Sequence, residues 1–205
     1  MPILGKTKRK VLTEFRMAEL LEAARKVFAE KGFHEATVDD IANTAGVAKG
    51  TIYLYYRSKR AIYWAALERG IAAMIEEVQT QVDAEETLEG KIRAFITIKL
   101  CYFERNRDFF KIYISEFGSA FTHPVQIRKR FGDLYLRQAR VLEALLREGI
   151  KRKAIRSIRA DTAALAISDL TRGIITQRLL GWSKGGVESD IRFIFDLVWK
   201  GIAAP

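Results

Sequence analysis

The chain has 205 residues, of which 49% are hydrophobic and only three are proline, so it can bury a core and is neither disordered nor fibrous. The single cysteine, Cys101, excludes an internal disulfide and a CxxC pair, and no apolar stretch approaches the roughly 20 residues that cross a bilayer. We therefore expect a globular, cytoplasmic protein without a membrane segment.

The net charge is +10 at pH 7, and the excess lies in two segments. Residues 1–60 hold 12 Lys and Arg against 7 Asp and Glu, which favours a polyanionic partner because such side chains displace counterions from phosphates. A solvated basic surface would give the same composition. The second segment, from Arg128 to Arg159, either binds an anion or only forms surface, and the sequence leaves both open.

Apolar residues recur at helical spacing along the whole chain, and no segment shows the alternation of a strand. The first long helix is expected over residues 15–30 and ends at Gly32. Five further helices are expected over residues 86–106, 108–118, 124–150, 162–180 and 190–203, with Asp108, Pro124, Asp161 and Ser189 at or before their first residues. The fold class is therefore all-α, with about nine helices in two domains, residues 1–60 and 61–205.

Two short helices and a longer one are expected between these segments. Thr37 lies three residues before Asp40, which is close to a capping box, and it predicts a helix that ends near residue 45. Gly46 can adopt the left-handed backbone that ends a helix tightly, so another short helix can occupy residues 49–55. Ser58 caps the longer helix that follows.

This spacing is typical of a helix-turn-helix, in which two helices cross closely and the second enters the major groove of DNA. Ala42 is the small residue at the crossing and Gly46 the turn glycine four residues later. The inward positions hold Ile41, Ala45, Val47, Ile52 and Tyr55. The outward face is left to Lys49, Gly50, Thr51 and Tyr53, whose cation, exposed backbone and hydroxyls suit phosphates and base edges.

The segment TVDDIANTAGVAKGTIYLYYRSK, within residues 18–67, resembles the N-terminal domain of TetR-family transcriptional regulators. The resemblance implies that Lys49, Thr51, Tyr53 and Tyr55 lie on or beside the recognition helix, and that Thr37 and Lys59 contact phosphate. It implies that Tyr56 belongs to the core. The chain departs from the common pattern where Ala48 replaces a frequent Ser, Arg60 a frequent Glu, and apolar Leu54 a polar residue.

The last two helices are expected to form a homodimer, as the resemblance also implies. The final helix is apolar around much of its circumference, so one face can serve the core and another a partner. The interface prediction names Ile174, Ile191, Phe195, Val198 and Ile202. A dimer would place two recognition helices in successive major grooves about 34 Å apart, on a palindromic operator in double-stranded DNA.

Aromatic residues are dense in the middle of the chain, where the family arranges helices around an effector cavity. A small, largely apolar effector is predicted to bind there. Its candidate contacts are Phe95, Tyr102, Phe103, Phe110, Tyr113, Phe117 and Tyr135. Aromatic stripes at helical spacing also form ordinary core, and that alternative stays open.

The main alternative hypothesis is that the protein is an enzyme. A second alternative is that it is an architectural DNA-binding protein. The two histidines, His34 and His123, lack metal-ligand spacing, and neither an HExxH nor a GxSxG motif occurs, so we expect no catalysis, no metal and no cofactor. A purely architectural protein would not need some 140 further residues rich in aromatics. The predicted function is a sequence-specific transcriptional regulator, a repressor released from its operator by the effector, although the sequence does not separate repression from activation.

Overall fold

Nine α-helices form almost all of the regular structure in the described residues, which confirms the all-α prediction. The computed structural model describes the backbone of residues 3–120 and 122–204, and side chains from residue 13 onward within those ranges. The chain divides into two compact units. The first comprises Met1–Gly70 with Asp108–Tyr113, and the second Ile71–Arg107 with Ile114–Pro205.

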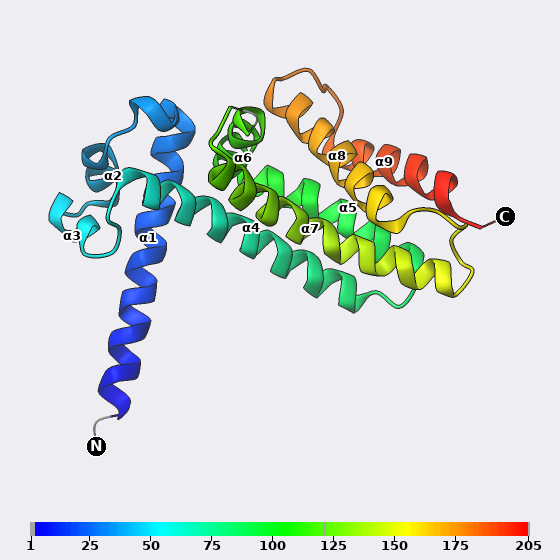
Figure 1. Ribbon diagram of the computed structural model, residues 1–205, viewed down its shortest axis with the longest axis horizontal. Coiled ribbons are helices and arrows are strands. Elements are labelled where there is room, and N and C mark those ends of the chain that lie inside the picture. Colours follow the sequence, from blue (N-terminus) through cyan, green and yellow to red (C-terminus); the bar gives the residue numbers. More distant parts are fainter. Residues whose placement is uncertain (1–2, 121, 205) are drawn as a thin grey trace. The chain divides into compact units, whose positions relative to one another are not determined.

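The first unit contains the predicted helix-turn-helix. It is built from α1 (Ile3–Glu35), α2 (Val38–Ala45), α3 (Lys49–Tyr53) and residues 59–70 of α4 (Lys59–Ala84), and α2 and α3 lie beside the end of α1 (Figure 1). Its buried core includes Leu20, Leu21, Ala24, Val27, Phe28, Ile41, Ala42, Ile52, Ile62, Tyr63 and Trp64. Phe28 and Tyr63 meet edge to face with ring centroids 5.2 Å apart, which joins α1 to α4.

A short part of α6 (Arg107–Ser119) completes the first unit. The ring of Phe109 packs directly on the backbone of α4 at Gly70, where an added Cβ would lie only 2.3 Å from the ring. Gly70 is therefore required by close packing, not by backbone conformation.

The second unit combines residues 71–84 of α4 with α5 (Leu88–Arg105), the rest of α6, α7 (Val125–Lys151), α8 (Ala160–Leu179) and α9 (Val187–Ile202). Figure 1 shows α5, α7, α8 and α9 side by side, and all of them contribute to one apolar core. Arg178 of α8 adds a polar link, because its guanidinium pairs with Glu104 of α5 at 2.6 Å and with Asp190 of α9 at 2.7 Å.

Several predicted helix starts are wrong by one to three residues. α8 begins at Ala160 after Arg159 and α9 at Val187 after Gly186, so Asp161 and Ser189 lie inside their helices and do not cap them. Asp108 likewise lies within the first turn of α6, whose N-cap is Asn106. An acidic side chain stabilises a first turn as well as a cap position, because it meets the positive end of the helix dipole. Pro124 is the N-cap residue of α7, as predicted.

No helix in the described part of the chain has both the length and the apolarity that a membrane crossing requires. The same residues hold no cluster of three or more His, Cys, Asp or Glu side chains placed to bind a metal ion.

Candidate DNA-binding site and effector pocket

The turn between α2 and α3 has the geometry that the sequence predicts. Gly46 adopts the left-handed conformation with φ 66° and ψ 32°, and its N–H donates back to the last turn of α2. Val47 N–H then donates to Ala42 C=O at 3.0 Å, which closes the turn. Ile41, Ala42 and Ile52 are buried at the crossing, so the angle between the two helices is fixed by packing.

The outward face of α3 carries the predicted groups. Lys49, Gly50 and Tyr53 are exposed and Thr51 is half-buried, whereas Tyr56 is buried in the core as the resemblance implied. The helix ends at Tyr53, two residues earlier than predicted, so Tyr55 lies half-buried in the following turn. The face can therefore present a cation, a close backbone and hydroxyls to DNA.

Leu54 is the residue of this surface that sequence reasoning left without a role. It is 80% exposed beside Tyr53, although a leucine gains nothing from contact with water. The methyl group of thymine in the major groove is the kind of partner that an exposed apolar side chain can contact. In the sequence, the only indication of this exposed apolar side chain was that Leu54 stands where a polar residue is common.

Lys49 is held by an ion pair in this structure. Its ammonium lies 2.7 Å from the carboxylate of Asp39 on α2, and this hydrogen bond raises the pKa of Lys49. Both side chains are about half exposed, so water screens the pair and it stabilises the fold little. A DNA phosphate can therefore replace Asp39 at small cost.

Thr37 forms the predicted capping box at the start of α2. Its Oγ accepts from Asp40 N–H at 3.1 Å, and its own N–H donates to the Asp40 carboxylate at 2.9 Å. A hydrogen bond from Lys31, with further bonds from Thr37, lowers the pKa of Asp40 to about 2. The N-terminus of α2 is thus fixed, and Thr37 remains exposed there.

Lys59 has partners within its own unit. Its ammonium donates to the carbonyls of His34 at 2.9 Å and Ala36 at 2.7 Å, and it lies over the ring of Phe33. Lys59 therefore ties the start of α4 to the end of α1. The predicted phosphate contact would have to be made in addition to these bonds. Ser58 caps α4 as predicted, because its Oγ accepts from Ala61 N–H.

The predicted effector residues are divided between the two units. Phe110 and Tyr113 cluster with Phe109 in the first unit. Phe117 and Tyr135 meet in the second unit, where Arg172 stacks on Phe117 at 3.8 Å. Tyr102 and Phe103 are buried, with the guanidinium groups of Arg105 and Arg107 over their rings.

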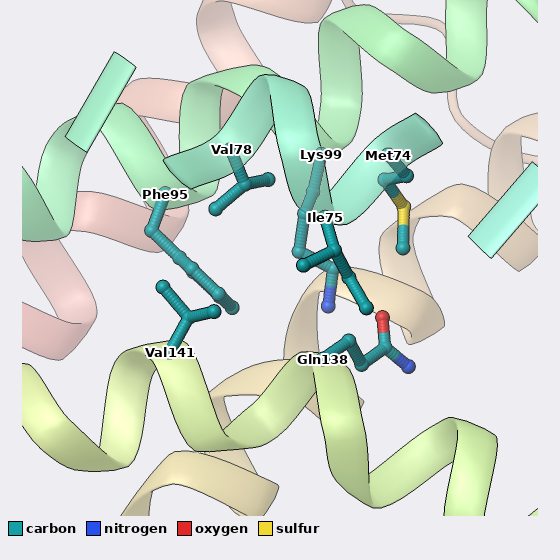
Figure 2. A pocket seen from close by; sticks show the side chains of 7 residues that line it. All are labelled: Met74, Ile75, Val78, Phe95, Lys99, Gln138 and Val141. Atoms are coloured by element: carbon teal, nitrogen blue, oxygen red, sulfur yellow. The ribbon is translucent and has the colours of Figure 1, made fainter. Parts of the chain in front are cut away.

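Phe95 does line a pocket of the second unit (Figure 2). The space between its side chains is too narrow for a water-sized sphere. Its walls come from α4, α5 and α7, and consist of Met74, Ile75, Val78, Phe95, Lys99, Gln138 and Val141.

Lys99 is the residue of this pocket that the aromatic pattern did not reveal. Its side chain is 4% exposed, and it follows Phe95 by one helical turn on the buried face of α5. Burial lowers the pKa of Lys99 to about 7, against the attraction of Asp169 and together with the repulsion of Arg172. In the sequence, the indication of a buried amine was a lysine at an inward position of an apolar helical stripe.

The predicted interface residues of α9 are buried within their own protomer. Ile191, Phe195, Val198 and Ile202 all belong to the core of the second unit. Ile174 of α8 is half-buried. The outward side of α9 instead presents Phe193 and Leu197, which are 58% and 54% exposed. An amphipathic helix turns its more apolar face toward its own core first, and a partner would meet the other side.

Most of the basic segment from Arg128 to Arg159 lies at the surface. Arg128, Lys129 and Arg130 are exposed near the start of α7, and Arg147 pairs with Glu143 further along the same helix. This part of the chain therefore forms solvated surface in the structure.

Comparison with known proteins agrees with this geometry. Residues 20–66 match the family model of bacterial regulatory proteins, tetR family. The fatty acid metabolism regulator protein of Bacillus subtilis is 26% identical over 133 residues, 65% of this chain and 67% of that protein. The transcriptional repressor KstR2 of Rhodococcus jostii is 29% identical over 209 residues, 93% of this chain and 92% of that protein.

Other relatives match over a smaller share: three of them, one named as an activator, are matched over only 38%, 58% and 40% of their length. Among solved structures, the regulator FadR of Bacillus subtilis in complex with stearoyl-CoA superposes with a TM-score of 0.80 at 22% identity, over 90% of this chain and 98% of that one.

A helix-turn-helix unit joined through a continuous helix to a second helical unit defines a DNA-binding transcriptional regulator. Residues 20–66 therefore carry the segment that defines bacterial regulatory proteins of the tetR family, and the chain is similar over most of its length to the transcriptional repressor KstR2.

Proposed function

We propose that this protein is a homodimeric repressor that binds a palindromic operator through α3 and leaves it when a small, largely apolar ligand binds in the second unit. The observation that carries the proposal is the outward face of α3, where Lys49, Gly50 and Tyr53 are exposed on a rigid support. In this proposal, residues 1–60 are the DNA-binding domain and residues 61–205 bind the effector and the partner.

Lys49, Thr51 and Tyr53 would contact phosphates and base edges in the major groove, and Tyr55, Thr37 and Lys59 would fix the orientation of the domain on the backbone. Gly50 supports close approach, because open space surrounds the position of its missing Cβ.

The proposed dimer would use the outward sides of α8 and α9. Phe193 and Leu197 lie one turn apart on α9, and Leu180 and Trp182, which follow α8, are 53% and 72% exposed. Large apolar side chains with this exposure mark an interaction surface when they gather at one place. A second copy of the chain is the partner that the two half-sites of a palindrome require.

The proposed switch follows from α4, which is one continuous helix. It carries Lys59 in the first unit and Met74, Ile75 and Val78 in the pocket wall of the second. The pocket does not admit a water-sized sphere, whereas typical ligand sites hold roughly 300 Å³ or more, so a bound ligand must displace a wall. Moving a population from 1:99 to 99:1 requires a preference of about 5.5 kcal/mol for one state.

The test begins with selection of bound duplexes from a random DNA pool, because the operator is to be found. Fluorescence anisotropy on the selected duplex then measures release by hydrophobic compounds, beginning with stearoyl-CoA, the ligand of the Bacillus subtilis FadR structure. We expect a palindromic site and at least one compound that weakens binding tenfold or more. Compounds that bind the protein by calorimetry and leave operator affinity unchanged would contradict the release mechanism.

A transcription assay separates repression from activation. We expect transcription from a promoter that overlaps the selected site to fall when the protein is added. A rise would contradict the repressor assignment and agree with the relative that is named as an activator.

A further inference from the structure

The pocket of the second unit is apolar except at one end, where α5 places an amine. Figure 2 shows the side chain of Lys99 projecting from α5 into the gap that Ile75 of α4 and Gln138 of α7 also line. Phe95, Met74, Val78 and Val141 supply the apolar remainder, and Lys99 is 96% buried by the side chains around it. A lysine is almost never buried to this extent unless it is paired.

No ion pair among the described residues includes Lys99. The groups that act on its charge come from α8, where Asp169 attracts the ammonium and Arg172 repels it. Asp169 is already occupied, because it pairs with Arg172 at 3.1 Å and accepts the hydroxyl of Tyr135 from α7. The residues of α4 that face the pocket are uncharged, and so is Gln138 of α7. Asp169 thus attracts the charge of Lys99 without forming an ion pair with it.

Two polar atoms of α8 are buried without a hydrogen-bond partner in the described structure. They are Ser168 Oγ and Arg172 Nε, one turn apart on α8, which packs against α5 and α7. A buried donor without a partner is destabilising, and native structures contain few such groups. A buried lysine outside any ion pair, with an unpartnered hydroxyl and guanidinium N–H on a helix that packs against its own, indicates a place where a ligand supplies acceptor atoms.

We propose that this pocket binds an apolar carboxylic acid, with the carboxylate accepting from Lys99 Nζ and the hydrocarbon part between α4, α5 and α7. The inference rests on the proposed effector pocket and adds the chemical class of the effector. A single ammonium balances a monoanion, whereas a phosphate dianion would bring an excess negative charge into an apolar space. A neutral apolar molecule would leave Lys99 unpaired.

The test compares carboxylates with alcohols of equal chain length by isothermal titration calorimetry on the full chain. The probes are hexanoate, octanoate and decanoate, each beside its 1-alcohol. We expect the best carboxylate to bind at least tenfold more tightly than its alcohol. Equal affinity of acid and alcohol, or no binding by any of the carboxylates, would overturn the proposal.

A second readout is the proton that binding takes up. At about pH 8 the amine of Lys99 is mostly neutral, since its pKa is lowered to about 7, and pairing with a carboxylate requires it to be protonated. Titrations in phosphate and in Tris, which differ in ionisation enthalpy, should therefore report uptake of close to one proton for the carboxylate and none for the alcohol. Absence of proton uptake with a bound carboxylate would contradict the pairing.

Two lysine variants localise the effect. Lys99→Met keeps the length and apolar stem of the side chain, and it should weaken carboxylate binding tenfold or more, abolish proton uptake, and leave alcohol binding unchanged or tighter. Lys91→Met, on the same helix at a half-exposed position, is the matched control and should behave as the wild type. If the Lys99→Met variant bound carboxylates as tightly as the wild type, the carboxylate-binding site would have to lie elsewhere.

Release of the operator by a ligand and carboxylate binding by Lys99 are separate proposals, and one can fail while the other holds. Decanoate that binds through Lys99 and leaves the operator complex intact would support the carboxylate site and count against release by ligand. Release of the operator by an acid in Lys99→Met, to the same extent as in the wild type, would support the release mechanism and overturn the role of Lys99.

Discussion

Lys99 keeps a titratable amine in apolar surroundings, and this makes stability depend on pH. The pKa of Lys99 is lowered to about 7 in the folded chain, whereas an unfolded lysine titrates near 10.4. Between these values the unfolded chain binds more protons, so the free energy of unfolding rises with pH across that window. Below pH 7 both states are protonated, and the full cost of the buried charge is present.

We predict that Lys99→Met is more stable than the wild type by a few kcal/mol at pH 7, and that the difference shrinks toward pH 10. Urea unfolding followed by circular dichroism at both pH values measures it, with Lys91→Met as the control. A difference that stays constant with pH would contradict the lowered pKa of Lys99.

Ala48 is a second residue whose chemistry has a measurable consequence. It is the N-cap of α3 and makes no side-chain hydrogen bond there, at the position where related proteins frequently carry Ser. Ala48→Ser should stabilise the first unit by about 1 kcal/mol, because a hydroxyl can accept from an unpaired N–H of the first turn. Thermal melts of Ala48→Ser and of Ala48→Val, which cannot accept a hydrogen bond, test it. Equal melting temperatures for the two variants would contradict the explanation.

At the scale of elements, the turn between α2 and α3 depends on one glycine. Gly46 has φ 66°, where a residue with a Cβ is strained, whereas Gly50 of α3 has an ordinary negative φ and open space around it. We predict that Gly46→Ala loses about 1–2 kcal/mol of stability and that Gly50→Ala loses none. Denaturant titration of the pair measures this difference, and equal stability would contradict the strain argument.

Patterns that involve only a few neighbouring residues, such as the turn glycine, explain which structural features could be predicted from the sequence. Thr37 with Asp40, and Gly46 four residues after Ala42, depend on a few neighbouring residues, and the structure confirms the capping box and the left-handed turn. The starts of α8 and α9 were predicted wrongly, because a lone acidic or hydroxyl residue suits a cap and a first turn equally well.

At the scale of the whole molecule, the contacts between helices could not be predicted from the sequence. The aromatic residues were recognised as inward-facing, and most of them are buried, but helical spacing does not tell which helix a given face meets. Of these aromatic residues, Phe95 lines the pocket of the second unit, and Lys99 forms the polar end of that pocket. The residues expected at the dimer interface lie in the protomer core for the same reason.

The proposed dimer is tested by two matched substitutions on α9. Leu197 is 54% exposed and Phe195 is 2% exposed, two residues apart on opposite sides of the helix. Leu197→Glu should give a folded monomer, because the charge is solvated in the protomer and buried only in a dimer. Phe195→Glu should unfold the chain. Sedimentation velocity at micromolar concentration distinguishes these outcomes, and a Leu197→Glu protein that sediments like a wild-type dimer would place the interface elsewhere.

We predict that the outward face of α3 distinguishes one DNA sequence from another, and the ratio of two binding affinities measures this. Fluorescence anisotropy at fixed salt compares the selected duplex with a scrambled one, for the wild type and for the triple variant Lys49→Ala, Thr51→Ala and Tyr53→Phe. All three side chains lie outside the buried core, so the melting temperature should not change. The account predicts a ratio of about 10³ or more for the wild type and a value near 1 for the variant. A folded variant that keeps the wild-type ratio would contradict it.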